Sequence, residues 1–268
     1  MKLKRVKPAD ELRLDDAAAA RPEGLPDDEV LEEETKKLGK ELASLQNALY
    51  AEGKQALLVV FQARDAGGKD GAIKRVFGPL NPQGSYVASF KQPTEEELAH
   101  DYLWRIHKVM PERGYIGIFN RSHYEDVLVV RVKGLAPKEV WKRRYTQIND
   151  FERMLVESGT RILKFFLHVS RDEQKARLLE RLDDPEKNWK FRAGDLEARA
   201  QWDAYTDAYR DALSRCSTPW APWYVVPADD KRVRDYLVSR KVLTTLRKMN
   251  PQYPPADPEV MAWRDKIV

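Results

Sequence analysis

The sequence has one cysteine and no long apolar segment among its 268 residues. Cys216 alone cannot form an internal disulfide, which favours a reducing compartment. The longest apolar runs, at 56–61 and 162–169, fall far short of the roughly 20 residues that span a bilayer. The first residues, MKLKRV, lack the apolar core of a secretory signal. We therefore expect a cytoplasmic protein with no membrane partner.

A strong excess of one charge is also missing. Lysine and arginine number 47, aspartate and glutamate 43, and the formal net charge is +4. This balance, together with the lack of a recognised nucleic-acid motif, argues against nucleic acid as a partner. Charged residues nevertheless make up 34% of the chain, above the usual share of about 25%. Any anion-binding site must therefore come from local clustering of cations.

The chain divides into a short amino-terminal arm and one larger domain. Residues 1–29 are rich in Ala, Pro, Asp and Glu without a sustained period, which predicts an extended or flexible arm. Residues 30–268 fit one domain, since single α/β domains reach about 250 residues. Leucines spaced at threes, fours and sevens predict a helix over 30–52. This N-terminal helical extension and the arm favour a homo-oligomer, a dimer or tetramer, with the arm lying on a partner subunit.

Strand and helix patterns alternate along the domain. The continuous apolar run at 55–61 is typical of a strand buried on both faces, so we expect it at the centre of a sheet. Stretches with helical periodicity separate it from later apolar runs, which indicates an α/β fold with a parallel sheet flanked by helices. The further predicted strands are 86–90, 114–119, 162–169 and 223–226.

Helix starts and one interruption complete this outline. Thr94 and Ser170 each precede a glutamate by three residues, the capping-box pattern that marks a helix start. Residues 182–195 break the helical period between basic segments. We therefore expect a helical lid at about 178–200 that moves over a site.

A glycine-bearing turn follows the expected central strand directly. Residues 63–70 read Ala-Arg-Asp-Ala-Gly-Gly-Lys-Asp, close to the G-x-x-x-x-G-K-[ST] pattern, in which backbone N–H groups and the lysine hold phosphate oxygens. Lys69 takes the lysine position, whereas Ala63 replaces the first glycine and Asp70 replaces the Ser or Thr that binds magnesium. The pattern favours a phosphate-binding loop. A plain glycine-rich turn with a surface lysine is the alternative.

Asp65 is the candidate that compensates for the missing hydroxyl. It lies inside the loop and offers a hard oxygen, the kind of ligand that magnesium prefers. Aspartate is also common in turns for conformational reasons, which is the alternative interpretation. We expect Asp65 to hold the metal.

A second polar cluster follows the expected third strand. Asn120 and Arg121 come directly after it, at the edge where open α/β sheets gather ligands, so we expect them to face the phosphates. Glu125 and Asp126 could hold a metal directly or through water, or could equally be charges that complement a helix N-terminus. His123 has no partner pattern, and we interpret it as a packing residue.

Basic residues gather around the expected lid and after the phosphate-binding loop. Arg177 and Arg181 share one helix face, where a bound anion would relieve their mutual repulsion. Together the cations could line a channel longer than one nucleoside triphosphate requires. A solvated face is the alternative. The set comprises Lys74, Arg75, Lys175, Arg177, Arg181, Lys187, Lys190 and Arg192.

Three motifs stand in a set order along the chain. They are Phe61-x-x-x-Asp65-x-x-Gly68-Lys69-Asp70-Gly71, the run FNRSHYEDV at 119–127 and the segment RLDDPEKNWK at 181–190. With them the sequence resembles the polyphosphate kinase 2 family over about 31–250. The resemblance implies a P-loop kinase core with a helical lid, similar to thymidylate kinase. It also implies phosphoryl transfer between inorganic polyphosphate and nucleotides with Mg²⁺, or Mn²⁺ in its place. The second motif resembles that of class III members, which convert AMP and ADP towards ATP.

Position by position, the resemblance also assigns roles. Asp65 and Lys69 would be the Walker A residues, Asn120 and Arg121 would occupy the Walker B site, and Arg181 would be the lid arginine. Many family members have Asp where Asn120 stands, so the expected metal ligands are Asp65, Glu125 and Asp126. The expected catalytic residues are Asp65, Lys69, Arg121 and Arg181, and the expected nucleotide contacts are Asp65, Asn120, Arg121 and Glu125. The expected polyphosphate contacts are Ala66, Gly67, Gly68, Lys69, Asp70, Lys74, Arg75, Arg181, Lys187 and Lys190.

Two other functions are compatible with the same loop. An ATP-dependent nucleoside monophosphate kinase would share the core but needs a bounded donor pocket rather than a long cationic groove. A regulatory protein could bind nucleotide or phosphate without turnover. The carboxylates and the lid arginines favour an enzyme, and the choice of phosphate donor separates the two kinases.

Overall fold

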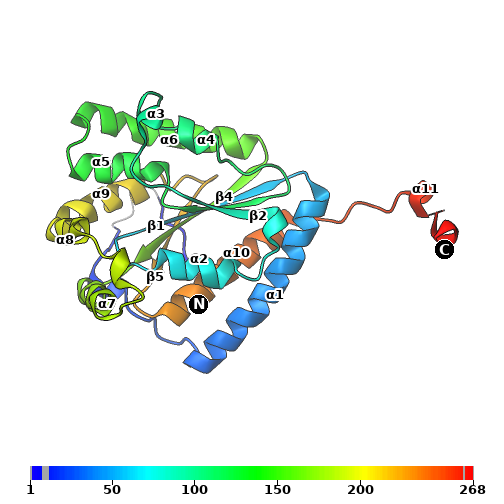
Figure 1. Cartoon of the computed structure of the whole chain (residues 1–268), viewed down its shortest axis with the longest axis horizontal. Helices are drawn as coiled ribbons and strands as arrows, with labels where there is room; N and C mark the ends of the chain where they lie inside the picture. The colour runs from blue at the N-terminus through cyan, green and yellow to red at the C-terminus, as the bar shows by residue number, and fades with distance from the viewer. Residues whose placement is uncertain (1, 8–11, 262, 268) are drawn as a thin grey trace.

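The computed structural model describes residues 2–7, 12–261 and 263–267, and a five-stranded sheet lies at its centre (Figure 1). The strand order is β2-β3-β1-β4-β5, and all neighbouring strands are parallel. β1 is therefore the central strand, as predicted, and all eight of its residues are buried. The strands are β1 (Ala56–Ala63), β2 (Ser85–Ser89), β3 (Ile116–Asn120), β4 (Thr160–His168) and β5 (Trp223–Pro227).

The five predicted strands are all present, with small shifts at their ends. β1 continues two residues beyond the predicted end because Gln62 and Ala63 still pair with β4. β3 begins at Ile116 rather than at 114, because Gly114 has a φ of 92° and its N–H turns to the carbonyl oxygen of Gln55 at 2.7 Å. The α/β prediction with a parallel sheet is confirmed.

The side chains of β1 alternate between two apolar cores. Leu57 and Val59 enter one core, whereas Leu58 and Val60 enter the other. A strand that is buried on both faces needs apolar residues at every position, which explains the continuous run in the sequence. The first core is covered by α1 (Asp28–Glu52), α2 (Lys69–Phe77) and α10 (Lys231–Met249), and the second by α4 (Trp104–His107), α6 (Lys138–Glu157) and α9 (Trp202–Arg215).

The helix predicted over 30–52 is α1, which begins two residues earlier. Its leucine stripe faces the first core, where Leu31, Leu42 and Leu49 are fully buried. α1 lies along α10, and exposed ion pairs such as Arg232–Glu32 join the two helices.

The region predicted as a lid contains the end of α7 (Arg171–Asp183), the short 3-10 helix η4 (Asn188–Lys190) and α8 (Ala193–Ala200). The start of α7 at Ser170 has only one of the two hydrogen bonds of the expected capping box. The Ser170 hydroxyl accepts a hydrogen bond from the Glu173 N–H, but the Glu173 carboxylate binds Arg177 instead of reaching back. The box at Thr94 is complete. Movement of the lid stays a prediction.

The described part of the amino-terminal arm lies on its own chain. Arg5 forms an antiparallel bridge with Tyr224 of β5, and the Val6 N–H donates to the carbonyl oxygen of Trp223 at 2.9 Å. Further along, Leu14 and Ala19 are buried. Residues 1 and 8–11 of the predicted arm lie outside the described residues. The described part of the arm is thus an extension of the domain.

Short elements and a projecting end complete the chain. In Figure 1 the segment after α10 leaves the body of the molecule and carries α11 (Pro258–Met261). None of the helices in the described ranges is both long and apolar enough to cross a membrane. The remaining short helices are η1 (Asp16–Ala18), η2 (Pro82–Gly84), α3 (Glu95–Leu98), η3 (His123–Val127), α5 (Val129–Val132) and η5 (Arg264–Lys266).

Candidate active site at the carboxyl edge of the sheet

Two loops meet where β1 and β3 end. The strands are neighbours in which Phe61 pairs with Asn120, so the loops that follow them start side by side. The N–H of Arg121 donates to the carbonyl oxygen of Phe61 at 3.0 Å. Arg121 has a φ of 64°, in the left-handed region that residues with a side chain seldom adopt. Such backbone positions concentrate at functional sites.

The loop after β1 has the backbone of a phosphate cradle. Ala66 and Gly68 have φ values of 59° and 88°, and Gly68 is the residue that caps the start of α2. A Cβ at Gly68 would lie 2.2 Å from Nη1 of Arg234, and a Cβ at Gly67 would lie 2.9 Å from the carbonyl oxygen of Arg64. Close packing therefore requires glycine at both positions. The first N–H groups of a helix have no acceptor within the helix, so the start of α2 favours an anion here.

Lys69 is folded back onto this loop and is buried. Its ammonium donates to the carbonyl oxygens of Ala63 at 3.1 Å and Arg64 at 3.5 Å. Burial and the nearby charge of Arg121 lower the pKa of Lys69 to about 8, although neighbouring carboxylates oppose the shift. A phosphate beside this ammonium would raise its pKa again.

Two side-chain contacts join the loops. Nη2 of Arg121 lies 2.8 Å from Oδ1 of Asp65, and Nδ2 of Asn120 donates to Oδ1 of Asp70 at 2.7 Å. The predicted phosphate-binding loop and the predicted second cluster are therefore one site. The structure brings together Asp65, Lys69, Asp70, Asn120 and Arg121.

Glu125 belongs to the same group. Its charge raises the pKa of both Lys69 and Arg121, and burial raises the pKa of its own carboxyl against the opposing effect of those two cations. With the amide of Gln62 oriented to match its neighbours, the amide nitrogen donates to Oε1 of Glu125 at 3.0 Å. Gln62 therefore holds this carboxylate from the end of β1. The sequence offered no signal for this contact beyond the one polar residue in an apolar strand.

Asp126 is contacted by two arginines. Its Oδ1 accepts from Arg144 at 3.0 Å, and its Oδ2 lies 4.0 Å from Arg105. The carboxylate is buried, and burial raises its pKa to about 6 in spite of both arginines. Asp126 therefore anchors the loop to α4 and α6, and a role as metal ligand stays a prediction.

The remaining donors suit a magnesium ion that is shared with a substrate. In the part of the chain that the structure describes, no group of three or more His, Cys, Asp or Glu side chains could hold a metal by itself. Magnesium commonly binds one or two carboxylates and completes its shell with phosphate oxygens and water. Asp65 and Glu125 supply hard oxygens of this kind, and both lie near enough to Lys69 to raise its pKa.

Two side chains of α7 donate hydrogen bonds to the backbone of the phosphate-binding loop. Nε2 of Gln174 donates to the carbonyl oxygen of Asp65 at 3.0 Å, and Nη1 of Arg177 donates to that of Ala66 at 3.2 Å. Arg177 also donates to the carbonyl oxygens of Ala228 and Asp229, at 2.6 and 2.9 Å. The shared helix face of Arg177 and Arg181 predicted either an anion ligand or a solvated face. The buried guanidinium of Arg177 instead joins the loop to the start of α10, a role that only tertiary structure reveals.

The cations predicted to bind polyphosphate are spread over three places. Lys74 and Arg75 are exposed on α2. Lys187 is paired with Glu180 and Asp184 at 2.8 Å each, and Lys190 lies 5.2 Å from the ring of exposed Trp189. Arg181 lies near the end of α7. Its Nη1 is 3.9 Å from Asp195, whose pKa is raised first by burial and then by Asp65.

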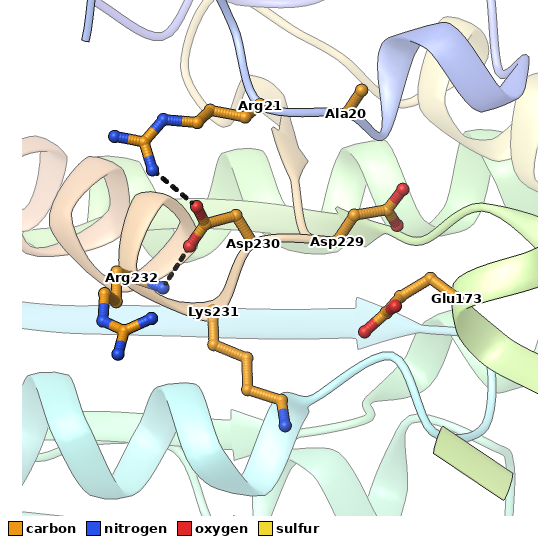
Figure 2. Close-up of a pocket in the computed structure, with 7 residues that line it drawn as sticks. All are labelled: Ala20, Arg21, Glu173, Asp229, Asp230, Lys231 and Arg232. Atoms are coloured by element: carbon orange, nitrogen blue, oxygen red, sulfur yellow. Dashed lines mark hydrogen bonds and ion pairs between the residues drawn. The ribbon is translucent and has the colours of Figure 1, made fainter. Parts of the chain in front are cut away.

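The surface also has hollows that the residues of the two loops do not line. One of about 510 Å³ is lined by side chains of both signs, and Figure 2 shows Lys231 extending from the start of α10 toward α2. Across it, Arg21 of the arm binds Asp230 at 2.8 Å. None of its lining residues belongs to the loops after β1 and β3. They are Ala20, Arg21, Glu173, Asp229, Asp230, Lys231 and Arg232.

Comparison with known proteins covers both loops and the lid region. The sequence profile of the family described as polyphosphate kinase 2 matches residues 26–254. An AMP/ADP-polyphosphate phosphotransferase from Meiothermus ruber is 58% identical, over 86% of this chain and 85% of its own. An ADP-polyphosphate phosphotransferase from Rhodopseudomonas palustris is 49% identical, over 85% and 84%. The crystal structure of polyphosphate kinase 2 from Arthrobacter aurescens TC1 is similar with a TM-score of 0.91 and 41% identity, over 99% and 98% of the two chains.

Proposed function

The chain belongs to the polyphosphate kinase 2 family, and from that premise we propose that it transfers phosphoryl groups from inorganic polyphosphate to AMP and ADP in a reversible reaction. The relative from Meiothermus ruber is named for both acceptors and the relative from Rhodopseudomonas palustris for ADP. The greater identity to the former supports the use of both nucleotides, with ADP and ATP as products.

The meeting of Lys69, Arg121 and Asp65 at the ends of β1 and β3 carries this proposal. Phosphoryl transfer needs in-line positioning and cancellation of charge on the transferred oxygens, more than a strong nucleophile. The acceptor is a nucleotide phosphate whose oxygen is already ionised, so a general base is unnecessary. Lys69 would leave the carbonyl oxygen of Ala63 and bind phosphate oxygens, while Arg121 would face the transferred group.

Magnesium is the proposed cofactor, with manganese as its substitute. Asp65 and Glu125 would hold it, and Asn120 would contact the nucleotide rather than the ion, because an amide is a weaker ligand than a carboxylate. When bound, the ion neutralises charge on the phosphate oxygens. Asp65 would then exchange part of its contact with Arg121 for the metal, which frees the guanidinium for phosphate.

The lid is proposed to close over the polyphosphate. Arg181 would reach the transferred group, and Lys187 and Lys190 would follow the chain of phosphates outward, together with Lys74 and Arg75 on α2. Closure would exclude water and so limit hydrolysis of the donor.

Assembly and location are proposed more coarsely. Cys216 is a buried free thiol, which suits the reducing cytosol. We keep the expectation of a homo-oligomer and assign the contact to surfaces other than the described arm, because that arm packs on its own domain.

The decisive experiment supplies the donor and the acceptor separately. Purified protein is incubated with magnesium, long-chain polyphosphate and either AMP or ADP, and ADP and ATP are followed by chromatography. Formation of ATP from both acceptors supports the proposal. Phosphorylation of a monophosphate by ATP alone would instead support a nucleoside monophosphate kinase, and tight binding without turnover would support a regulator.

A further inference from the structure

A buried polar network lies beneath the loop that follows β3. Its centre is an ion pair between Lys164 of β4 and Glu152 of α6, both with fully buried side chains. The Lys164 ammonium also donates to the hydroxyl of Tyr124 and to the carbonyl oxygen of Cys216, each at 2.7 Å. Oε1 of Glu152 receives the Tyr124 hydroxyl at 2.9 Å and lies 3.3 Å from Nε2 of His123.

The charges in this network are balanced within it. Burial alone would raise the pKa of Glu152, but the Lys164 ammonium and the contact with His123 lower it below its usual value. Burial lowers the pKa of His123, so its ring is neutral at pH 7 and donates from Nε2 to the carboxylate. The network therefore holds one negative and one positive charge, with two neutral groups attached.

Stability alone does not explain a charged pair at this depth. Removing two charges from water costs several kcal/mol per ion, and well-packed apolar residues in place of a buried pair are often as stable or more so. The surroundings are apolar and aromatic, and the ring of Trp223 lies 5.3 Å from the ammonium. What the pair supplies is a defined direction for each hydrogen bond that it makes.

These hydrogen bonds hold the loop that follows β3. His123 and Tyr124 are the residues of that loop that reach down to the pair, and they stand between Arg121 and Glu125, which face the site. Tyr124 is fully buried against Trp223, with ring centroids 4.7 Å apart. A shift of the two anchored residues would therefore shift the residues on either side.

We infer that Glu152 and Lys164 are positioning residues that fix His123 and Tyr124 beneath the loop and thereby set the places of Arg121 and Glu125 for phosphoryl transfer. The inference rests on the proposed function for its kinetic test only. Neither residue touches a substrate, and their effect on the reaction passes through the loop.

Two variants separate positioning from general stability. Tyr124→Phe removes the hydroxyl that links the loop to the pair and leaves the pair in place. Glu152→Gln with Lys164→Met removes both charges together, so no unpaired charge is left. The neutral Gln oxygen is a weaker acceptor for His123 and Tyr124 than the carboxylate, and the Tyr124 hydroxyl loses the hydrogen bond from Lys164. Thr245→Val is the matched control, since it removes a buried hydroxyl that donates to the Lys241 carbonyl oxygen on α10.

The expected result is a change in rate that does not follow stability. Misplacement of a reacting group by about 1 Å can cost 100-fold, so we expect kcat with ADP and polyphosphate to fall about 10- to 100-fold in both variants. KM for polyphosphate should change less than about threefold, since the phosphate-binding loop is untouched. The melting temperature of the double variant should stay near that of the wild type, and the control should keep the wild-type kcat.

Amide hydrogen exchange gives a second measurement that does not depend on catalysis. We expect residues 121–128 to exchange faster in both variants while α10 keeps its protection. A double variant that keeps both its melting temperature and its kcat would overturn the inference, as would unchanged exchange in the loop. If the double variant does not fold, kcat and the hydrogen exchange of residues 121–128 in Tyr124→Phe test the inference. If the wild type transfers no phosphate from polyphosphate, the proposed function fails and the exchange measurement still tests the inference.

Discussion

The guanidinium of Arg121 lies 2.8 Å from the carboxylate of Asp65, and this pair connects the loop after β3 with the loop after β1. Each residue is also a candidate for contact with substrate or metal. The two charges therefore hold each other in place in the free protein. On the proposed function, this contact is exchanged for contacts with phosphate and metal when the substrates bind.

Replacement of Lys69 by alanine should remove most of the transfer activity. In Lys69→Ala no ammonium remains to reach the phosphates, and we expect kcat to fall by at least about 100-fold, the usual effect of losing one donor to a transition state. Lys69→Arg keeps the charge but not the fit and should retain partial activity. Initial rates of ATP formation measure both, and a rate near that of the wild type in Lys69→Ala would show that the loop is not the phosphate cradle.

The lowered pKa of Lys69 predicts a pH dependence of polyphosphate binding. In the free protein the ammonium loses its proton at about pH 8. Because phosphate binds the charged form, KM for polyphosphate should be flat below pH 8 and should rise up to about tenfold per pH unit above it. Binding near pH 8.5 should also take up protons, which calorimetry in buffers of different ionisation enthalpy detects.

The same shift affects folding with the opposite sign. The unfolded chain holds the lysine proton up to its usual pKa near 10.5, whereas the folded chain releases it at about 8. Between these values the unfolded state binds more protons, so this residue's contribution favours folding increasingly as pH rises. Denaturant titrations of the wild type and Lys69→Met from pH 7.5 to 9.5 should differ in slope with pH in this direction. An identical pH dependence of the two proteins would contradict it.

Arg177 should contribute to the stability of the fold through its hydrogen bonds. Arg177→Met removes the donors of three backbone carbonyl oxygens, and we expect a loss of about 2–4 kcal/mol in the free energy of unfolding, since buried acceptors are left unpaired. Lys175→Met on the same helix is the control, because its side chain is exposed. If both variants have the same melting temperature, the hydrogen bonds of Arg177 do not stabilise the loop.

Gly68→Ala tests the packing of the phosphate-binding loop. The new Cβ would meet Arg234 at 2.2 Å, and the φ of 88° is strained for alanine. We expect a loss of about 1–3 kcal/mol in stability and a larger loss of activity. Gly194→Ala is the matched control, since a Cβ there meets nothing within 4 Å, and alanine favours its helix by up to about 1 kcal/mol. Equal melting temperatures for the two variants would refute the clash.

The sequence predicted the sheet and the meeting of the two loops for a physical reason. A strand that is buried on both faces carries a continuous apolar run, and the carboxyl ends of neighbouring parallel strands must lie together. Asp65 and Arg121, 56 positions apart in sequence, could therefore be assigned to one edge of the sheet.

The partners of the charged side chains could not be predicted in the same way. Asp126 faces Arg105 and Arg144, which lie on helices whose packing the sequence does not specify. Arg177 looked like a free cation because the backbone carbonyl oxygens that it binds carry no sequence signal. The ion pair of Lys164 and Glu152 could not be predicted either, since a lysine in an apolar strand gives no sign of the side chain that it contacts.

The arm has a consequence for how the protein is made. Val6 is bonded to Trp223, and the bridge of Arg5 and Tyr224 extends the outer edge of β5. This contact protects an edge that could otherwise pair with another chain. On the ribosome the arm is synthesised before β5, so its docking site is completed only when β5 has been made. The arm therefore stays undocked while the intervening chain is synthesised, and the β5 edge is covered only after that strand has formed.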